Sequence, residues 1–272
     1  MKKTTSKGNL RPSRDEHLCQ KVWNYARVNE LTHQTYCEFL SSQVIFQTIQ
    51  DILGLRFNNL EFLFEALTHS SFVNEFGKLE MRSYERLEFL GDALVDFFVS
   101  KELNSRYPDL KEGELSKLRS SLVNENSLSE LAWRHALSEG LIMGKAEILS
   151  NGWAKESILA DIVESLIAAV YLDQGIDQAE KAFQQLLRGT DDFFGLTKLE
   201  EFDAKSRLQE KTMALYKVLP EYRATELSDG NFKIELFISS FFISSLEAPS
   251  KKKGEMKLAA KTLKEKLYVL KE

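Results

Sequence analysis

Three carboxylates lie within one short, otherwise apolar segment, Glu85-Arg86-Leu87-Glu88-Phe89-Leu90-Gly91-Asp92. Successive residues of a helix turn by about 100°, so the three acids of this segment would fall within roughly 60° of one another. The apolar residues expected on nearly the opposite face are Leu87, Leu90, Leu94, Phe97 and Phe98. Clustered carboxylates repel one another. The segment therefore predicts a helix whose acidic stripe needs a cation.

A second pair of acids lies downstream, in an almost entirely apolar segment. Asp161 and Glu164 are the only charged residues between Ile158 and Val170. A helix that is apolar nearly all round is expected to be buried. A buried carboxylate costs several kcal/mol unless it is paired or bound to a metal. The two acidic segments together predict a site for a hard cation.

The motif ERLEFLGD, followed by the LADIVES helix, resembles the catalytic domain of ribonuclease III, the endonuclease of double-stranded RNA. Further similar segments are Leu53–Phe57, Ala66–Ser71, Glu112–Arg119 and the region from Asp203 onward. The resemblance extends from about Val44 to the C-terminus. It implies an all-α nuclease domain followed by a small α+β domain, in the order α-β-β-β-α, that binds double-stranded RNA.

The sequence pattern agrees with two domains. We expect an N-terminal extension at 1–45, with a disordered tail and a helix, and a helical nuclease domain at 46–190. A linker at 191–202 and a double-stranded-RNA-binding domain at 203–272 would follow. Strands are expected at Tyr222–Glu226, Lys233–Ile238 and Phe241–Leu246, with Asp229-Gly230 as a hairpin signal. Helices are expected at Ala204–Tyr216 and Ser250–Leu270, and a loop at Gly144–Ser157.

The charge distribution favours an RNA partner for the last domain. Residues 203–272 contain 14 Lys and Arg against 10 Asp and Glu, whereas residues 45–202 contain 15 against 27. A basic module appended to an acidic domain suits a metal-dependent nuclease that binds phosphate elsewhere in the chain.

Phosphodiester hydrolysis needs an activated water and neutralisation of charge on the attacking and leaving oxygens, and Mg²⁺ held by carboxylates can supply both. We therefore assign Glu88, Asp161 and Glu164 as metal ligands, with Asp92 positioning a water or adding a ligand. The resemblance implies the same quartet, with Asp92 and Glu164 as the catalytic pair. Mn²⁺ is expected to substitute for Mg²⁺, and the number of ions is left open.

Other polar residues have competing interpretations. Glu85 has a supporting or interface role by resemblance, or else pairs with Arg86 or Arg119. His69 is expected to make structural hydrogen bonds and not to act as a base. The four histidines lack zinc-ligand spacing, which disfavours zinc. A set of charged residues at one helix start either caps that helix or contacts the substrate cleft: Glu112, Glu114, Lys117 and Arg119.

The RNA-binding candidates are Gln209, Glu210, Ser250, Lys251 and Lys252. A helix N-terminus rich in lysine attracts phosphate through its N–H groups and its charge. Three places in the chain depart from the family pattern. The family hairpin commonly carries Gly-Pro-x-His, whose His enters the minor groove, whereas this chain has Asp229-Gly230-Asn231-Phe232. Near the last helix, Leu246 and Ala248 replace two glycines and Gly254 replaces an alanine. The third place is Tyr84, which replaces a frequent asparagine. These departures concern substrate preference and binding strength.

The sequence thus predicts a Mg²⁺-dependent endonuclease of double-stranded RNA, acting in rRNA or mRNA processing. The resemblance implies 5′-phosphate and 3′-hydroxyl ends, and cutting two strands favours a homodimer. The alternatives are a catalytically inert RNA-binding or ribosome-associated protein and a hydrolase of small phosphoesters. No apolar run reaches the ~18 residues of a membrane span. The two cysteines form no disulfide pattern, so a cytoplasmic location without a membrane partner is expected.

Overall fold

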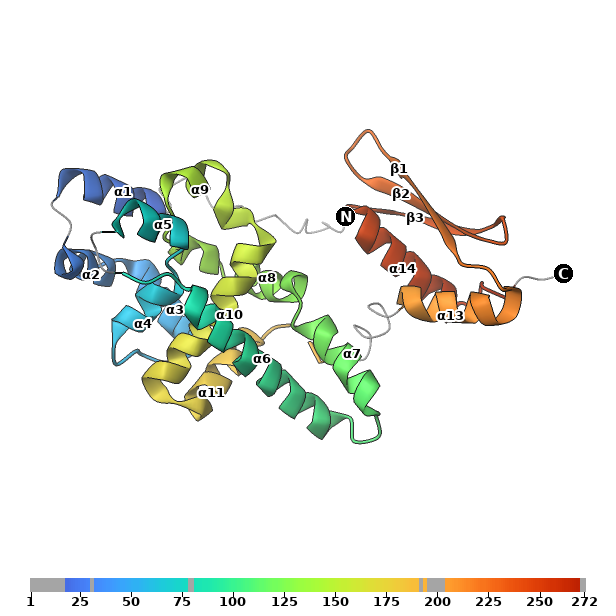
Figure 1. Ribbon diagram of the computed structural model, residues 1–272, viewed down its shortest axis with the longest axis horizontal. Helices are drawn as coiled ribbons and strands as arrows, with labels where there is room; N and C mark the ends of the chain where they lie inside the picture. The colour runs from blue at the N-terminus through green and yellow to red at the C-terminus, as the bar shows by residue number, and fades with distance from the viewer. Residues whose placement is uncertain (1–17, 30–31, 78–80, 191–192, 195–203, 270–272) are drawn as a thin grey trace, which may run out of the picture. The chain divides into compact units, whose positions relative to one another are not determined.

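The structure is a computed structural model that describes residues 18–29, 32–77, 81–190, 193–194 and 204–269 (Figure 1). The tail expected to be disordered, 1–14, and most of the expected linker, 191–202, lie outside the described residues. The chain divides into two compact units. The first comprises residues 1–98 and 124–189, and the second comprises residues 99–123 and 190–272. Helix α6 (Glu85–Arg106) passes from one unit into the other.

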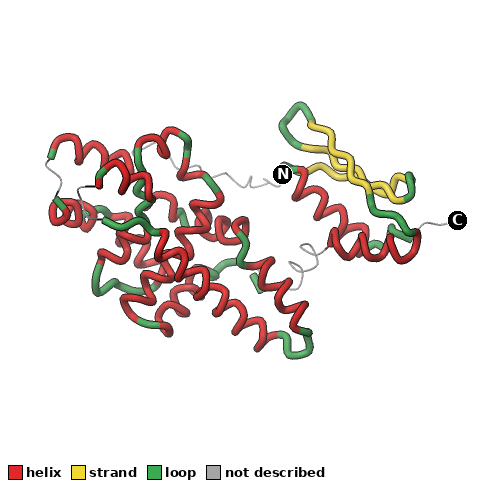
Figure 2. The backbone as a smooth tube through the Cα atoms, viewed as in Figure 1, coloured by secondary structure: helices red, strands yellow, loops and turns green. Residues whose placement is uncertain are grey.

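The described residues of the first unit form helices joined by loops, red and green in Figure 2, and one isolated parallel bridge between Thr68 and Ile142. Besides the first half of α6, its α-helices are α1 (Leu18–Val28), α2 (His33–Ser41), α3 (Val44–Leu53), α4 (Leu60–Ala66), α5 (Ser70–Glu75), α8 (Glu125–Arg134), α9 (Lys145–Leu149), α10 (Glu156–Gln174) and α11 (Ile176–Leu186). It also has the short 3-10 helices η2 (Leu137–Gly140) and η3 (Gly152–Ala154). Helices α9 and η3 occupy the segment that was expected to be a loop. That expectation was wrong because short helices carry too few apolar repeats for their period to be visible.

Helix α10 is the centre of the first unit and packs against α4, α8 and α11. Its residues from Ile158 to Val170 are buried apart from the half-buried Asp161 and Glu164, with Ser165 among the buried ones. The Ser165 hydroxyl donates to the carbonyl oxygen of Ala66 at 2.7 Å, which satisfies a polar group inside the core. The prediction of a buried helix carrying two acids is confirmed.

Helix α6 has a core face, an acidic stripe and an exposed apolar face. Leu87, Leu94 and Phe98 are buried as expected, whereas Phe97 is 54% exposed. Phe97 was expected on the same face as Phe98, but it lies about 100° around the helix from Phe98 and is left outside the core. Phe89 is also exposed, at 82%. These two phenylalanines lie on the same outer face.

The N-terminal helices belong to the first unit. The rings of Trp23 in α1 and Phe76 lie 5.1 Å apart, and those of Tyr36 in α2 and Phe72 in α5 lie 5.6 Å apart. Both distances are in the range of favourable aromatic pairs. The segment before Val44 is therefore packed onto the rest of the first unit.

The second unit contains α7 (Glu112–Leu122) and, at its C-terminal end, α13 (Ala204–Tyr216), β1 (Glu221–Glu226), β2 (Phe232–Ile238), β3 (Phe241–Ala248) and α14 (Lys251–Lys264). The strands form an antiparallel sheet in the order β1-β2-β3. This order confirms the predicted α-β-β-β-α domain. Helix α14 ends six residues before Leu270, at Lys264, and Lys266 adopts a positive φ of 53°.

The small domain has its own core. Buried residues from both helices and the central strand meet there: Ala204, Leu208, Ile234, Leu236, Leu258 and Ala259. Gly254 is buried where α14 approaches β2, and a Cβ atom at this position would lie 2.5 Å from Cγ1 of Ile234. The close packing therefore explains the replacement of the usual alanine.

Two local features of the second unit also bear on the sequence analysis. At the hairpin, Asp229 Oδ1 accepts a hydrogen bond from the Asn231 N–H at 3.0 Å, and Gly230 has a φ of 82°. At the start of α7, Glu114 Oε2 accepts a hydrogen bond from the Lys111 N–H at 3.0 Å, which supports the capping interpretation of that acid.

Within the described residues, none of the helices combines the length and the apolar character needed to cross a bilayer.

Candidate active site

Helices α6 and α10 come into close contact at Gly91. A Cβ atom placed on Gly91 would lie only 2.0 Å from the backbone carbonyl oxygen of Glu164. Any side chain would force the two helices apart, so this contact requires glycine. The contact places the acidic stripe of α6 next to the two acids of α10.

The acids of the two helices form one electrostatic cluster. Burial raises the pKa of Glu164 to about 8, with further contributions from Asp92, Asp161, Glu88 and Asp96. Every charged neighbour that shifts this pKa is another acid. Burial, which disfavours the charged form, is the main physical cause, and repulsion from the like charges adds to it.

Glu88 responds in the same way. Burial raises the pKa of its carboxyl group first, and the charges of Asp161, Glu85 and Asp92 raise it further. The structure thus brings together, in one environment, the four acids assigned from the sequence and Glu85. Glu85 is exposed, and its Oε2 accepts a hydrogen bond from the Ser83 hydroxyl at 3.2 Å.

Tyr84 fixes one member of the cluster. Its buried side chain donates a hydrogen bond from the hydroxyl to Asp161 Oδ2 at 3.2 Å. Burial raises the pKa of Asp161, and this hydrogen bond partly opposes the rise. From the sequence, Tyr84 was recognised only as a departure from the family pattern, and its hydrogen bond to Asp161 was not predicted. Residues 77 positions apart give no sequence signal for such a pair.

Asp96 and Glu125 were also missed. Asp96 raises the pKa of Glu164, and Glu125 raises the pKa of Asp161. Asp96 lies one helical turn beyond Asp92, so the spacing of acids along α6 could have identified it. Glu125 begins α8, and only the tertiary fold brings it near α10.

His69 has a structural role. Its Nδ1 accepts a hydrogen bond from the Ser71 N–H at 3.1 Å and lies 2.7 Å from the Ser71 hydroxyl. The imidazole thereby caps α5. Burial lowers the pKa of His69, which favours the neutral ring. The expectation of structural hydrogen bonds is confirmed.

The donor chemistry of the cluster fits a hard divalent cation. All of the side chains are carboxylates, and oxygen ligands are what Mg²⁺ prefers. No three of the four assigned acids have ligand atoms all within 4.8 Å of one another, since the one such group among the described residues lies elsewhere. Mutual repulsion accounts for this spacing. Mg²⁺ keeps several waters and needs only one or two direct carboxylates.

The raised pKa of Glu164 leads to a test of the cluster without metal. Since the folded-state pKa of about 8 lies above the ordinary 4.5, ionisation of Glu164 costs the folded state free energy. The stability that the protonated, neutral Glu164 contributes is present below pH 4.5 and is lost as the pH rises towards 8. With metal removed by a chelator at about pH 9, the free energy of unfolding of Glu164→Gln should therefore exceed that of the unmodified protein by on the order of 1–2 kcal/mol.

Urea denaturation at about pH 5 and about pH 9 measures this difference. The difference in unfolding free energy between the variant and the unmodified protein should be smaller at the lower pH. Added Mg²⁺ should stabilise the unmodified protein more than the variant. Glu156→Gln, at the exposed start of α10, serves as the control. A variant that is less stable than the unmodified protein in chelator at the higher pH would show that Glu164 carries no such repulsion.

The candidate RNA-binding residues lie in the small domain. Gln209, Glu210, Lys251 and Lys252 are all exposed. The Ser250 hydroxyl caps α14 by accepting a hydrogen bond from the Lys253 N–H at 3.3 Å. Lys251 Nζ lies 5.3 Å from the centre of the Phe232 ring, in cation–π range. The side chains of Lys251 and Lys252 thus face solvent at the start of α14.

Comparison with known proteins reveals a clear likeness. A family model described as "Ribonuclease-III-like" matches residues 59–189. The chain is 36% identical over 225 residues to ribonuclease 3 of Myxococcus xanthus, covering 80% of this chain and 85% of that protein. It is 39% identical over 222 residues to ribonuclease 3 of Alkalilimnicola ehrlichii, covering 79% of this chain and 93% of that protein.

A solved structure, the nuclease domain of ribonuclease III from Campylobacter jejuni, is 35% identical with a TM-score of 0.49. The match covers 54% of this chain and 95% of that structure.

Proposed function

This chain belongs to the ribonuclease III family, and from that premise we propose that it cuts double-stranded RNA with Mg²⁺ held at the cluster formed by α6 and α10. The chain is an endoribonuclease, as its family membership implies. The family uses divalent metal ions. The choice of Mg²⁺, with Mn²⁺ as a substitute, is our proposal. So are 5′-phosphate and 3′-hydroxyl ends, a role in rRNA or mRNA processing and a cytoplasmic location.

One observation supports the proposed mechanism above all others. The acids of α6 and α10 share one partly buried environment, in which burial and the neighbouring acids raise the pKa of Glu164 to about 8. We propose that Glu88, Asp161 and Glu164 would hold the metal ion and that Asp92 would orient the attacking water or add a ligand. When bound, the ion supplies positive charge for the attacking and leaving oxygens and lowers the pKa of water.

The remaining roles belong to the chain itself. The Tyr84 hydroxyl holds the Asp161 carboxylate in one orientation, and Gly91 allows the two acidic helices to approach each other. Glu85, beside Glu88, contributes further negative charge to the cluster and thus supports cation binding. An inert RNA-binding protein remains the second candidate, but that role would not require four acids to be kept in a costly, mutually repelling arrangement.

A substrate panel tests the proposal. Perfect-duplex RNA, single-stranded RNA and duplex DNA of one sequence would be incubated with the full chain, with and without Mg²⁺. We expect cutting of the RNA duplex alone, only with metal, and fragments that carry a 5′-phosphate. Cutting of single-stranded RNA at an equal rate would refute duplex specificity, and binding without any cutting would favour the inert alternative.

We also propose a two-fold homodimer through the exposed face of α6. Phe89 and Phe97 present large apolar surfaces there, and a two-fold interface would use each residue twice. Phe89→Ala should raise the dimer dissociation constant roughly 100-fold or more, because each of two copies would lose about 1.5 kcal/mol or more of burial. Sedimentation at micromolar concentration measures this. Phe241→Ala, exposed in the small domain, is the control, and equal behaviour of the two variants would exclude this face.

The start of α14 is our proposed phosphate contact. Replacing Lys251 and Lys252 by alanine should weaken RNA binding and flatten the dependence of log affinity on log salt by about one unit per lost contact. The double replacement of Lys257 and Lys264, exposed on another face of α14, removes the same charge and should have less effect. Equal salt slopes for the two double variants would mean that position on the helix is irrelevant and that only net charge counts.

A further inference from the structure

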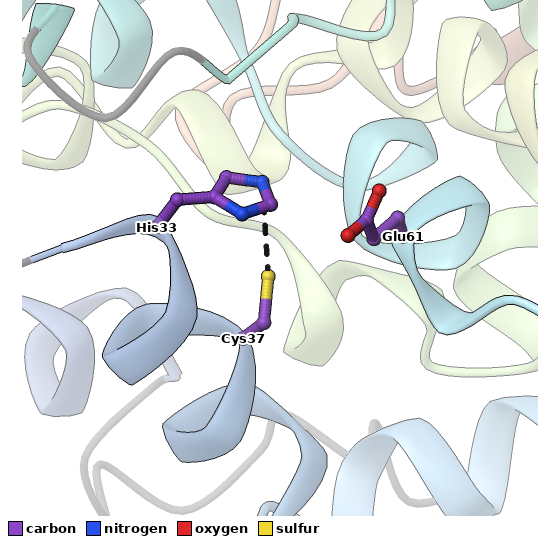
Figure 3. A group of neighbouring side chains, drawn as sticks. All are labelled: His33, Cys37 and Glu61. Carbon is purple, nitrogen blue, oxygen red and sulfur yellow. Dashed lines mark hydrogen bonds between the residues drawn. The ribbon is translucent and has the colours of Figure 1, made fainter.

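We propose a second metal site, distinct from the acidic cluster, in which His33, Cys37 and Glu61 bind Zn²⁺. Each residue offers one ligand atom, and the three ligand atoms all lie within 4.8 Å of one another. Figure 3 shows His33 and Cys37 extending from α2 towards Glu61 on α4. Among the described residues, this is the one group of three His, Cys or acidic side chains that comes so close together.

Two helices, α2 and α4, hold the three donors, and His33 and Glu61 lie in their capped first turns. His33 and Cys37 are four residues apart on α2 and therefore share one face. Thr32 and Thr35 form a reciprocal capping box around the first turn, where His33 lies, with hydrogen bonds of 3.0 and 3.2 Å. Glu61 lies in the first turn of α4, which Asn59 caps by accepting the Glu61 N–H at 3.0 Å. The backbones of the donors are thus fixed before any ion arrives.

The spacing of the donors fits a tetrahedral ion. Cys37 Sγ lies 3.9 Å from His33 Nε2. A sulfur and a nitrogen bound to one tetrahedral Zn²⁺ at their usual bond lengths are about 3.6 Å apart. Small rotations of exposed side chains would close the difference.

The types of donor select the ion. Mg²⁺ and Ca²⁺ take oxygen ligands, so a thiol and an imidazole make them poor occupants. Zn²⁺ accepts sulfur, nitrogen and oxygen together and imposes no geometry of its own. Three protein donors leave a fourth position for water, and the exposed side chains of His33 and Glu61 give solvent access to it.

A role for Cys37 as a reactive thiol fits less well. The carboxylate of Glu61 lies beside Cys37, whereas reactive thiols lie in electropositive surroundings. A divalent cation would offset the unfavourable placement of a thiol beside a carboxylate. The structure thus favours a ligand over a nucleophile.

The site would connect two parts of the chain. Helix α2 precedes the region that the family model matches, whereas Glu61 lies inside it. A bound ion would tie the N-terminal segment to the nuclease fold. Zinc was disfavoured from the sequence because the histidines lack zinc-ligand spacing. The pair His33 and Cys37 gave no signal, because the third donor comes from a different helix.

Cobalt spectroscopy of the full chain tests the site. Co²⁺ serves as a visible substitute for Zn²⁺, and a thiolate ligand adds a charge-transfer band that a carboxylate cluster cannot produce. We expect this band after one equivalent of Co²⁺ and its loss after one equivalent of Zn²⁺. The band should persist in Cys19→Ala, which removes the other cysteine, and should be absent in Cys37→Ala. A missing band in the unmodified protein, or a band that survives in Cys37→Ala, would overturn the proposal.

Thermal unfolding provides an independent readout that does not depend on colour. Zn²⁺ should raise the unfolding midpoint of the unmodified protein and of Cys19→Ala, because an ion that binds only the folded state stabilises it. With Mg²⁺ at saturation to occupy the acidic cluster, the rise should be lost in Cys37→Ala and should shrink in His33→Ala, while circular dichroism shows that both variants are folded. An equal rise in all four proteins would place the ion elsewhere and refute the site.

Discussion

Glu164→Gln is expected to lower the rate of RNA cleavage by several orders of magnitude while RNA binding survives. The substitution removes one negative charge but nearly preserves the shape of the side chain. A metal ion contributes several kcal/mol of stabilisation to the transition state, and each 1.4 kcal/mol corresponds to about tenfold in rate. Binding should persist because the proposed contacts to phosphate lie in the small domain.

Single-turnover cleavage of a labelled duplex at millimolar Mg²⁺, together with a binding assay, separates the two effects. Glu156→Gln makes the same chemical change on the same helix at an exposed position and should cleave normally. If Glu164→Gln keeps more than about a tenth of the unmodified rate, Glu164 does not belong to the catalytic machinery.

Gly91→Ala should be the most damaging small substitution in the chain. The added Cβ atom would lie 2.0 Å from the backbone oxygen of Glu164, and backbone atoms cannot rotate away as a side chain can. Separating α6 from α10 would break core packing and displace the acids from one another. We expect a loss of about 3 kcal/mol or more in unfolding free energy, together with loss of cleavage.

Gly113→Ala is the matched control for this prediction. A Cβ atom at Gly113 in α7 would meet nothing within 4 Å, and alanine favours helix by up to about 1 kcal/mol over glycine. Urea denaturation should therefore show a large loss for Gly91→Ala and no loss for Gly113→Ala. Similar midpoints for the two variants would mean that the contact at Gly91 does not hold the site together.

The periodic features of this fold could be predicted from sequence. Helix α10 is apolar nearly all round, the first half of α6 has apolar residues at helical spacing, and the hairpin at Asp229-Gly230 has a specific turn chemistry. The short helix α9 and the early end of α14 could not be predicted, because one or two turns carry no clear period and a helix end depends on local contacts.

Some features of the candidate active site could likewise be predicted from the sequence, and others could not. The four acids could be assigned because charged residues inside apolar segments need a partner, whichever way the chain folds. Their mutual repulsion, the hydrogen bond from Tyr84 and the role of Gly91 depend on distances between residues far apart in sequence. The exposure of Phe97 could not be foreseen either, since a helix period identifies a face but not which neighbours cover it.

We propose that the acids of α6 and α10 together bind a divalent cation. A crystal of the full chain soaked in Mn²⁺ tests it most directly, because the anomalous signal of Mn²⁺ gives the position of the ion without reference to activity. We predict a peak among Glu88, Asp92, Asp161 and Glu164, and its loss in Glu164→Gln crystals. An acidic cluster without a peak at saturating Mn²⁺, or with an equal peak in the variant, would contradict the claim.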